Sequence, residues 1–545
     1  MVKIQKQWNV LNKSIKGNII ETILKGRGIK DTSHFLNPRS EDMIDFELLS
    51  NIRAARNTVL DGIKYGKRFT VLWDSDLDGN AGGAITTLHL LNYTNQVNPI
   101  INQGKIHGLS GQNGEDLIAT TDILIAVDSL SNEHEHYKTL SDNGVKIICL
   151  DHHPSSLESQ KYATVVNSQL NDYPNKMLSG SGVALKFALY IDQYTGEEFA
   201  EDLYDLAACG LIADMMDIKD SWENRYICWR GMNSLKNIGI QEILNNYRFD
   251  GQAISYSIAP AINACNRTSN NELAMKLLLT QDKREVKSLV KQIKEIKKQQ
   301  DVLVDENVND VEFQIRNNLT EQSRVISGFV NDGGFSGLIA NKLASKYQMP
   351  CIILHENEEE TEVYKGSMRS YGLENFRDVL NQTKLCKALG HEGAAGVIIP
   401  KENWSKLIQK INEVLADVEF KVTVEADIEL NVKDIAFDLV QKIQQLNLIT
   451  GTGFKNIQVI LKNCPVDKLT LMQSKHTKFE NGSVEIIHWN NPRLFEELQC
   501  DTKGTYKTID VCGSLSISEF AGKEKINLIV SEYGNITEEL DFLRE

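Results

Sequence analysis

The fold is indicated first by an apolar run that ends in closely spaced aspartates. This segment reads Phe69-Thr70-Val71-Leu72-Trp73-Asp74-Ser75-Asp76-Leu77-Asp78-Gly79. A short run of aromatic and branched residues that stops at a turn signal predicts a buried strand, here at 69–73. Two similar runs, 123–127 and 145–150, are also followed by an aspartate, Asp128 and Asp151, and longer helical stretches separate the three runs. This alternation predicts a parallel α/β sheet.

The aspartates at the ends of these strands form a candidate metal site. Ligands of open α/β sheets bind at the carboxyl ends of the strands, so Asp74, Asp128 and Asp151 can converge on one site. Asp76 and Asp78 point the same way if the first strand continues, because alternate residues of a strand share a face. Clustered carboxylate oxygens suit Mg or Mn.

The same D-x-D-x-D-G pattern also opens the calcium loop of an EF-hand. That loop requires a bidentate glutamate at position 12, whereas position 12 counted from Asp74 is Ile85. An EF-hand loop also follows a helix, and the segment before Asp74 is predicted as a strand. Both differences count against calcium.

The tripeptide Asp151-His152-His153 gains its significance from its position at a strand end. Paired histidines are often ordinary surface residues, but a histidine there can give an imidazole nitrogen to Mn. Its neighbour can then contact the substrate or act as an acid. Asp214 ends another apolar stretch, and these residues together make a set suited to two metal ions.

Length, charge and cysteine content limit the kind of protein. A chain of 545 residues predicts about three or four domains. Its net charge of -15 argues against coating nucleic acid by bulk electrostatics, although a local basic groove remains compatible with it. Nine scattered cysteines indicate a reducing compartment. The absence of an apolar leader or of a run of about 18 apolar residues predicts a cytoplasmic protein without a membrane partner.

The pattern along the chain predicts five segments. A helical lead-in at 1–67 precedes an α/β catalytic domain at 68–240, and a connecting helical segment follows at 241–310. Within that segment, residues 272–310 contain no glycine or proline and predict one long helix. A second α/β domain is expected at 311–418. Alternating strands and turns at 419–545 predict a small β-barrel.

Three further motifs are open to two interpretations. The turn Ser179–Gly182 precedes an apolar helix and could cradle a phosphate, but a packing turn explains it more simply. The small residues of Gly390–Gly396 predict either a tightly packed strand or a close approach of His391 to phosphate. The basic run Lys283–Lys298 is interpreted as a solvated helix face rather than as a DNA contact.

The ordered motifs resemble those of the DHH phosphoesterase superfamily, specifically its RecJ-type single-strand exonucleases, over nearly the whole chain. The lead-in residues Arg27–Ile29 and Phe35–Pro38 are similar to the segment before the first family motif. The four metal motifs then correspond to Asp74–Gly79, Asp128, Asp151–Pro154 and Ala213-Asp214. Matches typical of RecJ-like nucleases are Pro260–Arg267, Gly366–Ser370, His391 and, for the OB-fold strand, Gly513–Phe520.

This resemblance implies a fold, an activity and site residues. It implies a DHH domain and a DHHA1-like domain joined by a long helix, with a C-terminal OB-fold that binds single strands. It implies a 5'-3' exonuclease that releases nucleoside 5'-monophosphates in DNA recombination, repair or replication, with single-stranded DNA as substrate and a single-strand binding protein as a suggested partner. Two Mn or Mg ions would be held by Asp76, Asp78, Asp128, His152 and Asp214, with Asp128 bridging and Asp74 as a further ligand.

The resemblance also implies roles beyond the metal ligands. His153 would act directly on the scissile phosphate, and Asp151 would be a metal ligand or would support one. His391, from the second domain, would stabilise the negative charge of that phosphate. The residues implied to hold the terminal 5' phosphate are Arg267, Ser367 and Arg369. Arginine suits this task because its fork pairs phosphate oxygens bidentately.

Four positions depart from the family pattern. Leu130, Ala261, Asn266 and Leu389 stand where the family has glycine, arginine, glycine and glycine. None removes an implied metal ligand, and a diverged member from a mobile or viral genome would show such changes.

Two alternatives remain open at the sequence level. A phosphodiesterase for short oligonucleotides or cyclic dinucleotides would be shorter and lack the OB-fold. A non-catalytic replication scaffold of the same fold would tolerate the loss of ligands. The preference for DNA over RNA is also open.

Overall fold

The protein, as a computed structural model, is described at residues 5–15, 17–104, 106, 108–129, 131, 133–155, 159–316, 319–320, 322–356, 360–500, 505–520 and 522–540. Leu130 lies outside these residues. The chain divides into two compact units, one of Met1–Val10 and Lys298–Glu425, the other of Leu11–Lys297 and Ala426–Glu545. No helix in the described ranges is long and apolar enough to cross a membrane.

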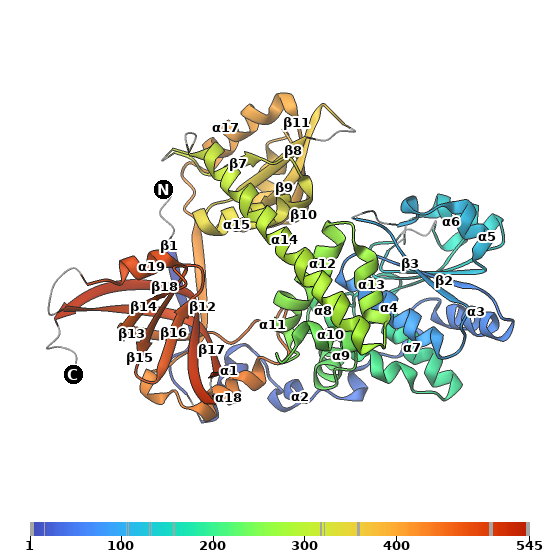
Figure 1. Ribbon diagram of the computed structural model, residues 1–545, viewed down its shortest axis with the longest axis horizontal. Helices are drawn as coiled ribbons and strands as arrows, with labels where there is room; N and C mark the ends of the chain where they lie inside the picture. Colours follow the sequence, from blue (N-terminus) through green and yellow to red (C-terminus); the bar gives the residue numbers. More distant parts are fainter. Residues whose placement is uncertain are drawn as a thin grey trace. The chain divides into compact units, whose positions relative to one another are not determined.

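The larger unit contains a five-stranded parallel sheet, whose strands β2 and β3 are labelled in Figure 1. Its order is β3-β2-β4-β5-β6, with every neighbouring pair parallel. The strands are β2 (Phe69–Trp73), β3 (Val97–Ile101), β4 (Ile123–Val127), β5 (Lys146–Asp151) and β6 (Thr164–Asn167). The predicted parallel α/β sheet is confirmed.

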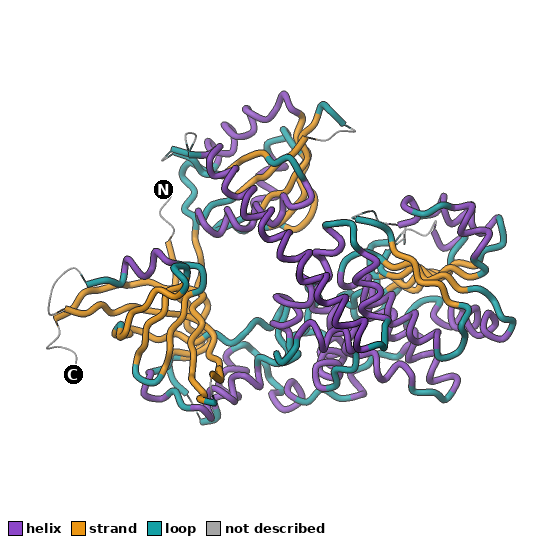
Figure 2. The backbone as a smooth tube through the Cα atoms, viewed as in Figure 1, coloured by secondary structure: helices purple, strands orange, loops and turns teal. Residues whose placement is uncertain are grey.

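Helices cover both faces of this sheet, as the strands between helices in Figure 2 show. Val71, Ile125 and Ile148 belong to one apolar core, whereas their neighbours Leu72 and Leu124 belong to another, because alternate residues of a strand face opposite sides. The first core includes residues of α3 (Ile52–Lys64), α4 (Leu77–Leu91) and α7 (Gly180–Thr195). The second includes residues of α5 (Gly114–Thr120) and α6 (His134–Asp142).

A helical layer follows the sheet. It consists of α8 (Tyr204–Ala213), α9 (Trp222–Asn233), α10 (Ile238–Leu244), α11 (Gly251–Ala253), α12 (Ala259–Arg267), α13 (Asn271–Leu279) and α14 (Lys283–Ile315). The single helix predicted at 272–310 is therefore wrong. Thr280 adopts an extended conformation, and the Asp282 side chain accepts the backbone N–H of Arg284 at 2.8 Å, which starts a new helix.

The lead-in is mostly helical, as predicted, except at its start. It begins with the strand β1 (Gln5–Asn12), and the helices α1 (Ile19–Gly26) and α2 (Thr32–Leu36) follow. β1 is the edge strand of an eight-stranded sheet. Whether a segment forms a strand depends more on its neighbouring strands and burial than on its own sequence, so this strand was not predicted.

A second α/β fold occupies the smaller unit. Its sheet has the order β10-β11-β9-β8-β7, and only β7 and β8 are parallel. The strands are β7 (Ile326–Phe329), β8 (Cys351–Glu356), β9 (Val363–Arg369), β10 (Lys387–His391) and β11 (Ala394–Pro400). The helices are α15 (Ser336–Tyr347), α16 (Phe376–Gln382) and α17 (Trp404–Val414).

The C-terminal segment is rich in strands, as the sequence predicted. The eight-stranded sheet has the order β1-β12-β13-β17-β18-β16-β15-β14. Its further strands are β12 (Lys421–Glu429), β13 (Val459–Pro465), β14 (Asp467–Met472), β15 (His476–Asn481), β16 (Val484–His488), β17 (Thr505–Phe520) and β18 (Lys523–Leu540). Two helices, α18 (Phe437–Leu446) and α19 (Pro492–Glu497), accompany them.

The lead-in fastens this C-terminal segment to the part of the larger unit that contains the parallel sheet. The Arg27 guanidinium donates to both carboxylate oxygens of Asp427, at 2.6 and 2.8 Å, and lies 4.4 Å from the ring centroid of Phe454. On the other side, the Arg225 guanidinium lies 3.3 Å from the ring centroid of Phe35, whose ring packs against Phe454 at 4.9 Å. A continuous apolar core and a buried ion pair therefore link the two parts.

Candidate metal centre

Acidic residues gather where β2, β4 and β5 end. These strands are neighbours in the sheet, and the first residues after β2 and β4 are Asp74 and Asp128, while Asp151 is the last residue of β5. Two groups of possible ligand atoms lie within 4.8 Å of one another inside each group, Asp74/Asp76/Asp128 and Asp78/His152/Asp214. A third group of this kind contains Asp128, Asp151, His152 and His153. The carboxylates therefore converge as the strand ends predict.

Asp76 and Asp78 converge for a different reason from the one predicted. The strand does not continue, because Asp76 is the N-cap of α4 and accepts the backbone N–H of Gly79 at 3.1 Å. Asp78 lies in the first turn of that helix. Helix geometry, rather than strand alternation, places the two carboxylates.

The start of α7 holds Asp78 in place. The Asp78 carboxylate accepts the backbone N–H groups of Gly180 at 2.7 Å and Ser181 at 3.1 Å, together with the hydroxyl of Ser181. The Ser179–Gly182 turn is thus a packing turn whose N–H groups bind a protein carboxylate. A Cβ at Gly180 would overlap the carboxylate of Asp128, and one at Gly210 would overlap that of Asp78, so both positions require glycine.

Asp128 is the most constrained of these carboxylates. Its backbone is left-handed, with φ of 61°, and its Oδ1 atom is buried without a hydrogen-bond partner among the residues that the structure describes. Burial raises its pKa well above the usual value, and the negative charges of Asp78, Asp76, Asp151 and Asp74 raise it further. A buried, unsatisfied acceptor surrounded by like charges is an environment that a cation would relieve.

Two neighbouring acids show the same electrostatic stress. Burial, and then the charges of Asp78 and Asp74, raise the pKa of Asp76 to about 6. Burial, and then the charges of Asp78 and Asp76, raise the pKa of Asp214 to about 7. The two adjoining groups offer oxygen and imidazole donors, and positive charge would offset the repulsion between their carboxylates. Both features fit two ions of the Mg or Mn type.

The two histidines have different environments. His152 is buried, and its Nε2 atom lies 3.2 Å from Asp128 Oδ1 and 3.4 Å from Asp214 Oδ2. Burial lowers its pKa, which favours the neutral imidazole that a metal requires. His153 is exposed, and its Nδ1 atom lies 2.8 Å from Asp151 Oδ1. This hydrogen bond raises the pKa of His153 to about 9.

The Asp151 carboxylate is buried and holds its neighbours through hydrogen bonds. Its two oxygens accept from His153 and from the backbone N–H of Ser131, the latter at 3.2 Å. Burial alone would raise its pKa, but the His153 hydrogen bond and charge lower it to about 2. The Asp151–His153 pair can therefore present a charged imidazole at the edge of the carboxylate cluster.

The end of α12 is fastened to the loop between Asp74 and Asp76. Arg267 is the last residue of that helix, and the Nδ2 atom of Asn266 donates to the Ser75 hydroxyl at 3.0 Å. Asn80 donates to the Ser75 carbonyl oxygen, also at 3.0 Å. The helix end that carries Arg267 is thereby held beside the Asp74–Asp76 loop. Sequence reasoning treated Asn266 only as a departure and did not single out Asn80, although a polar residue in place of glycine beside an arginine was an available signal.

Ser367, Arg369 and His391 lie in the smaller unit and share one face of its sheet. Arg369 pairs with Ala394, which pairs with His391, and Ser367 is two residues from Arg369 along β9. The Ser367 hydroxyl lies 3.0 Å from that of Ser336, the first residue of α15. The Arg369 guanidinium lies 2.9 Å from the place of a Cβ on Gly337. A helix start, a hydroxyl and a guanidinium together make a suitable anion site.

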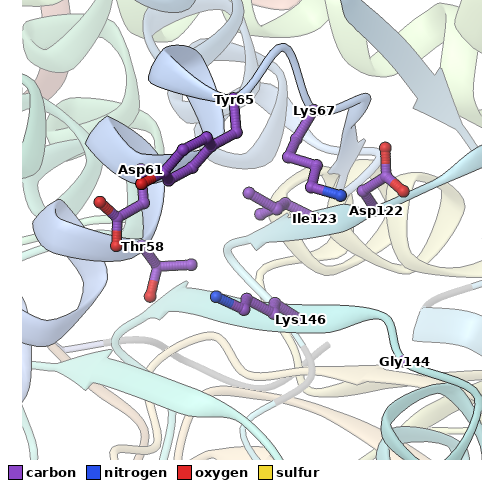
Figure 3. Close-up of a pocket in the computed structure, with 9 residues that line it drawn as sticks. Thr58, Asp61, Tyr65, Lys67, Asp122, Ile123, Gly144 and Lys146 are labelled. Carbon is purple, nitrogen blue, oxygen red and sulfur yellow. The ribbon is translucent and has the colours of Figure 1, made fainter.

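A surface hollow of about 130 Å3 lies at the other end of the parallel strands (Figure 3). Ile123 and Lys146, which begin β4 and β5, line it together with Tyr65 and Lys67. Its Asp122 is engaged by Arg68, whose Nε atom lies 3.1 Å away. None of the predicted site residues lines this hollow.

Three protein-family models match the chain in sequence order. They describe the DHH family, N-terminal domain, at residues 68–211, the DHHA1 domain at 322–417 and the RecJ OB domain at 426–532. A Bacillus subtilis relative whose name describes an SPbeta prophage-derived single-strand DNA-specific exonuclease, YorK, is 26% identical over 94% of this chain and 95% of its own length. The single-stranded-DNA-specific exonuclease RecJ of Bacillus subtilis is 25% identical over 94% of this chain and 67% of its own.

The solved structures show the same architecture. The structure of RecJ in complex with Mn2+ from Thermus thermophilus matches with a TM-score of 0.75 and 21% identity, over 98% of this chain and 80% of that one. The Mg2+ complex of the same protein matches with a TM-score of 0.71. The three-domain fold expected from the sequence motifs is thereby confirmed.

Proposed function

Because the chain belongs to the DHH family as a RecJ-type member, we propose that it is a metal-dependent exonuclease acting on single-stranded DNA. It would hydrolyse the strand from the 5' end and release nucleoside 5'-monophosphates. The single observation that carries the proposal is the buried Oδ1 atom of Asp128, which accepts no hydrogen bond from the described residues and lies between two groups of ligand-type side chains. A metal-dependent phosphodiesterase needs such a set of ligands, whereas a protein that binds no cation would only be destabilised by it.

The residues that would hold two divalent ions divide into two sets. Asp74, Asp76 and Asp128 form one, and Asp78, His152 and Asp214 form the other. Asp128 is suited to bridge them because its Oδ1 atom also lies 3.2 Å from His152 Nε2. When bound, the ions would stabilise the attacking and leaving oxygens of an in-line displacement.

The Asp151–His153 pair would act on the substrate itself. In the metal-free protein the hydrogen bond to Asp151 raises the pKa of His153 to about 9, which favours the protonated imidazole, and Asp151 holds its Nδ1 atom at 2.8 Å. The Nε2–H group then serves as a donor to a phosphate oxygen whose negative charge develops during hydrolysis. We assign Asp151 to positioning and His153 to direct contact.

The terminal phosphate would be held by arginines and hydroxyls. Arg267 is placed by the attachment of Asn266 to Ser75, and Arg369 and Ser367 lie at the start of α15. His391, exposed on the same sheet face as Arg369, would steady the scissile phosphate. Guanidinium forks pair phosphate oxygens bidentately, which suits recognition of a chain end.

The RecJ OB domain supports a polymeric substrate over a cyclic dinucleotide. OB-folds bind single strands through stacking and backbone contacts, and a small-molecule phosphodiesterase has no use for one. A single-strand binding protein is proposed as a partner because it would occupy the same substrate. The nine free cysteines support a reducing, cytoplasmic place of action.

Product analysis tests this proposal. The purified chain is incubated with Mn2+ and single-stranded DNA, duplex DNA or a cyclic dinucleotide, and products are separated by chromatography. We expect nucleoside 5'-monophosphates from the single strand only, and none from Asp128→Asn. Equal hydrolysis by the parent chain and Asp128→Asn would refute the assigned centre, and exclusive hydrolysis of the cyclic dinucleotide would favour the alternative enzyme class.

A further inference from the structure

The first turns of α14 carry an unusual concentration of positive charge. Residues 283–298 include seven lysine or arginine residues and two glutamates, in a chain whose net charge is -15. Arg284, Lys287, Lys291 and Lys294 are all exposed, and they recur at spacings of three and four residues. Such spacing places them on one side of a helix. We call these four residues the basic edge.

The basic edge is segregated from the rest of the helix surface. At 3.6 residues per turn, its four residues fall within an arc of about 80°. The neighbouring exposed arc carries Glu285, Ser288, Gln292 and Glu295, while the buried face carries Val286, Leu289, Val290 and Ile293. A face that serves only solubility mixes both signs of charge, whereas here cations are gathered along one side.

The structure gives these cations no acidic partners among the residues that it describes. Within the described part of the chain, no ion pair joins any of the four to a carboxylate. Several helical lysines elsewhere do have an acidic partner, as Lys25 has Glu21 and Lys442 has Asp438. Like charges three or four residues apart destabilise a helix, so the basic edge is an arrangement that gains stability from a polyanion.

We propose that the basic edge binds the sugar-phosphate backbone of the single strand, away from the end that is cleaved. This inference rests on the proposed exonuclease function. The four residues extend over about 15 Å along the helix, which suits successive phosphates of one extended strand. Contacts of this kind are independent of base sequence and depend on salt. The basic run that sequence alone assigned to a solvated helix face therefore has a function in substrate binding.

A pair of matched variants tests the inference. In the full chain with Asp128→Asn, which prevents cleavage, the basic edge is neutralised by Arg284→Gln, Lys287→Gln, Lys291→Gln and Lys294→Gln. The control neutralises four exposed helical lysines that have intrahelical partners, Lys25, Lys276, Lys410 and Lys442, also to Gln. Both variants lose four positive charges, so they differ only in which charges are lost.

Binding of a long labelled single strand is measured by titration at several salt concentrations. We expect the basic-edge variant to bind at least about tenfold more weakly at low salt, and the slope of log Kd against log salt to fall by about 0.7 for each lost contact. The control should match the parent. Equal affinity and equal slope for both quadruple variants would overturn the inference, as would a loss of binding to an acidic peptide with no loss for DNA.

Measurements of hydrolysis distinguish a failure of this inference from a failure of the proposed function. In chains that retain Asp128, the ratio of Mn2+-dependent hydrolysis of a long strand to that of a trinucleotide should fall for the basic-edge variant alone. If the parent chain hydrolyses neither substrate, the proposed function fails while the binding comparison still decides the role of the basic edge. If the parent hydrolyses both and the ratio is the same for both variants, the basic edge has no such role.

Discussion

Asp128 has a left-handed backbone and a buried carboxylate that neighbouring carboxylates repel. Substitution by asparagine tests the role of the carboxylate because asparagine suits this backbone and has nearly the same shape. Asparagine and aspartate adopt this backbone region more readily than most residues, so Asp128→Asn should fold. Asparagine does not ionise, so it avoids the cost of keeping a carboxyl with a raised pKa buried among other acids, and the midpoint of thermal unfolding of the metal-free protein should rise by a few degrees. The same variant should lose the stabilisation that Mn2+ gives the parent chain, because a ligand is gone.

Calorimetry with and without Mn2+ checks both halves of this prediction. Asp220→Asn, an exposed acid outside the cluster, is the control and should leave the Mn2+ effect intact. A variant at Asp128 that is destabilised without metal, yet still fully stabilised by Mn2+, would show that the carboxylate is not a ligand.

Asn266 is predicted to position Arg267 through its hydrogen bond to Ser75. Asn266→Ala and Ser75→Ala each remove this buried bond, at a cost of about 1 kcal/mol in stability. Steady-state kinetics should show KM for the DNA end rising about five- to tenfold while kcat changes little, since the metal ligands stay in place. The double variant should be no worse than either single variant, because both remove the same bond. Additive losses would assign the two residues to separate tasks.

At the scale of single residues, the sequence reveals the acids of the candidate metal centre better than the residues that hold them in place. Asp74, Asp128 and Asp151 could be predicted because strand ends in a parallel sheet share one edge. The partnership of Asn266 with Ser75 could not, since it joins residues 191 positions apart in the chain and depends on how α12 packs. The roles of Ser367, Arg369 and His391 remain predictions, supported by their shared sheet face.

The start of α7 is the element on which the carboxylate geometry depends most. Gly180→Ala would place a methyl group against the carboxylate of Asp128, and overpacking of this kind costs about 1–3 kcal/mol. We expect the variant to be less stable and to bind Mn2+ more weakly, as measured by urea unfolding and metal titration. Gly114→Ala, at the start of α5 with open space around it, should change neither measurement. Equal effects at the two glycines would contradict the crowding argument.

Elements were predicted well where a local pattern decides them and poorly where distant contacts do. The strands 69–73 and 123–127 appear with those same bounds, because continuous apolar runs bury both faces. The break between α13 and α14 was missed because no glycine or proline marks it, and Asp282 as a helix cap is a weak signal. The strand β1 was missed because its sheet partner lies about 400 residues away in the sequence.

At the scale of the whole molecule, the lead-in should act as a fastener between the catalytic part and the C-terminal strands. Arg27→Ala leaves Asp427, whose side chain is only 5% exposed, without its cation, and breaking a buried pair in this way costs about 3–5 kcal/mol. Limited proteolysis should then release the C-terminal segment faster than in the parent. Arg53→Ala breaks an exposed pair with Glu47 and should have almost no effect. Indistinguishable digestion of the two variants would refute this role.

The order of the domains could be predicted from the sequence because each domain carries a motif with a chemical role. Three family models match the chain in that same order. The exact boundaries remain predictions. The departures Ala261, Asn266 and Leu389 leave the carboxylate cluster complete, as its geometry shows.

Hydrolysis of end-labelled single-stranded DNA tests the central claim most directly. One substrate carries a label at its 5' terminal nucleotide, the other at its 3' terminal nucleotide, and each is incubated with the purified chain and Mn2+ over a time course. We predict that labelled mononucleotide appears at once from the 5' label and only late from the 3' label, and that Asp128→Asn releases neither. Early release from the 3' label, or release by Asp128→Asn at the rate of the parent chain, would contradict the account.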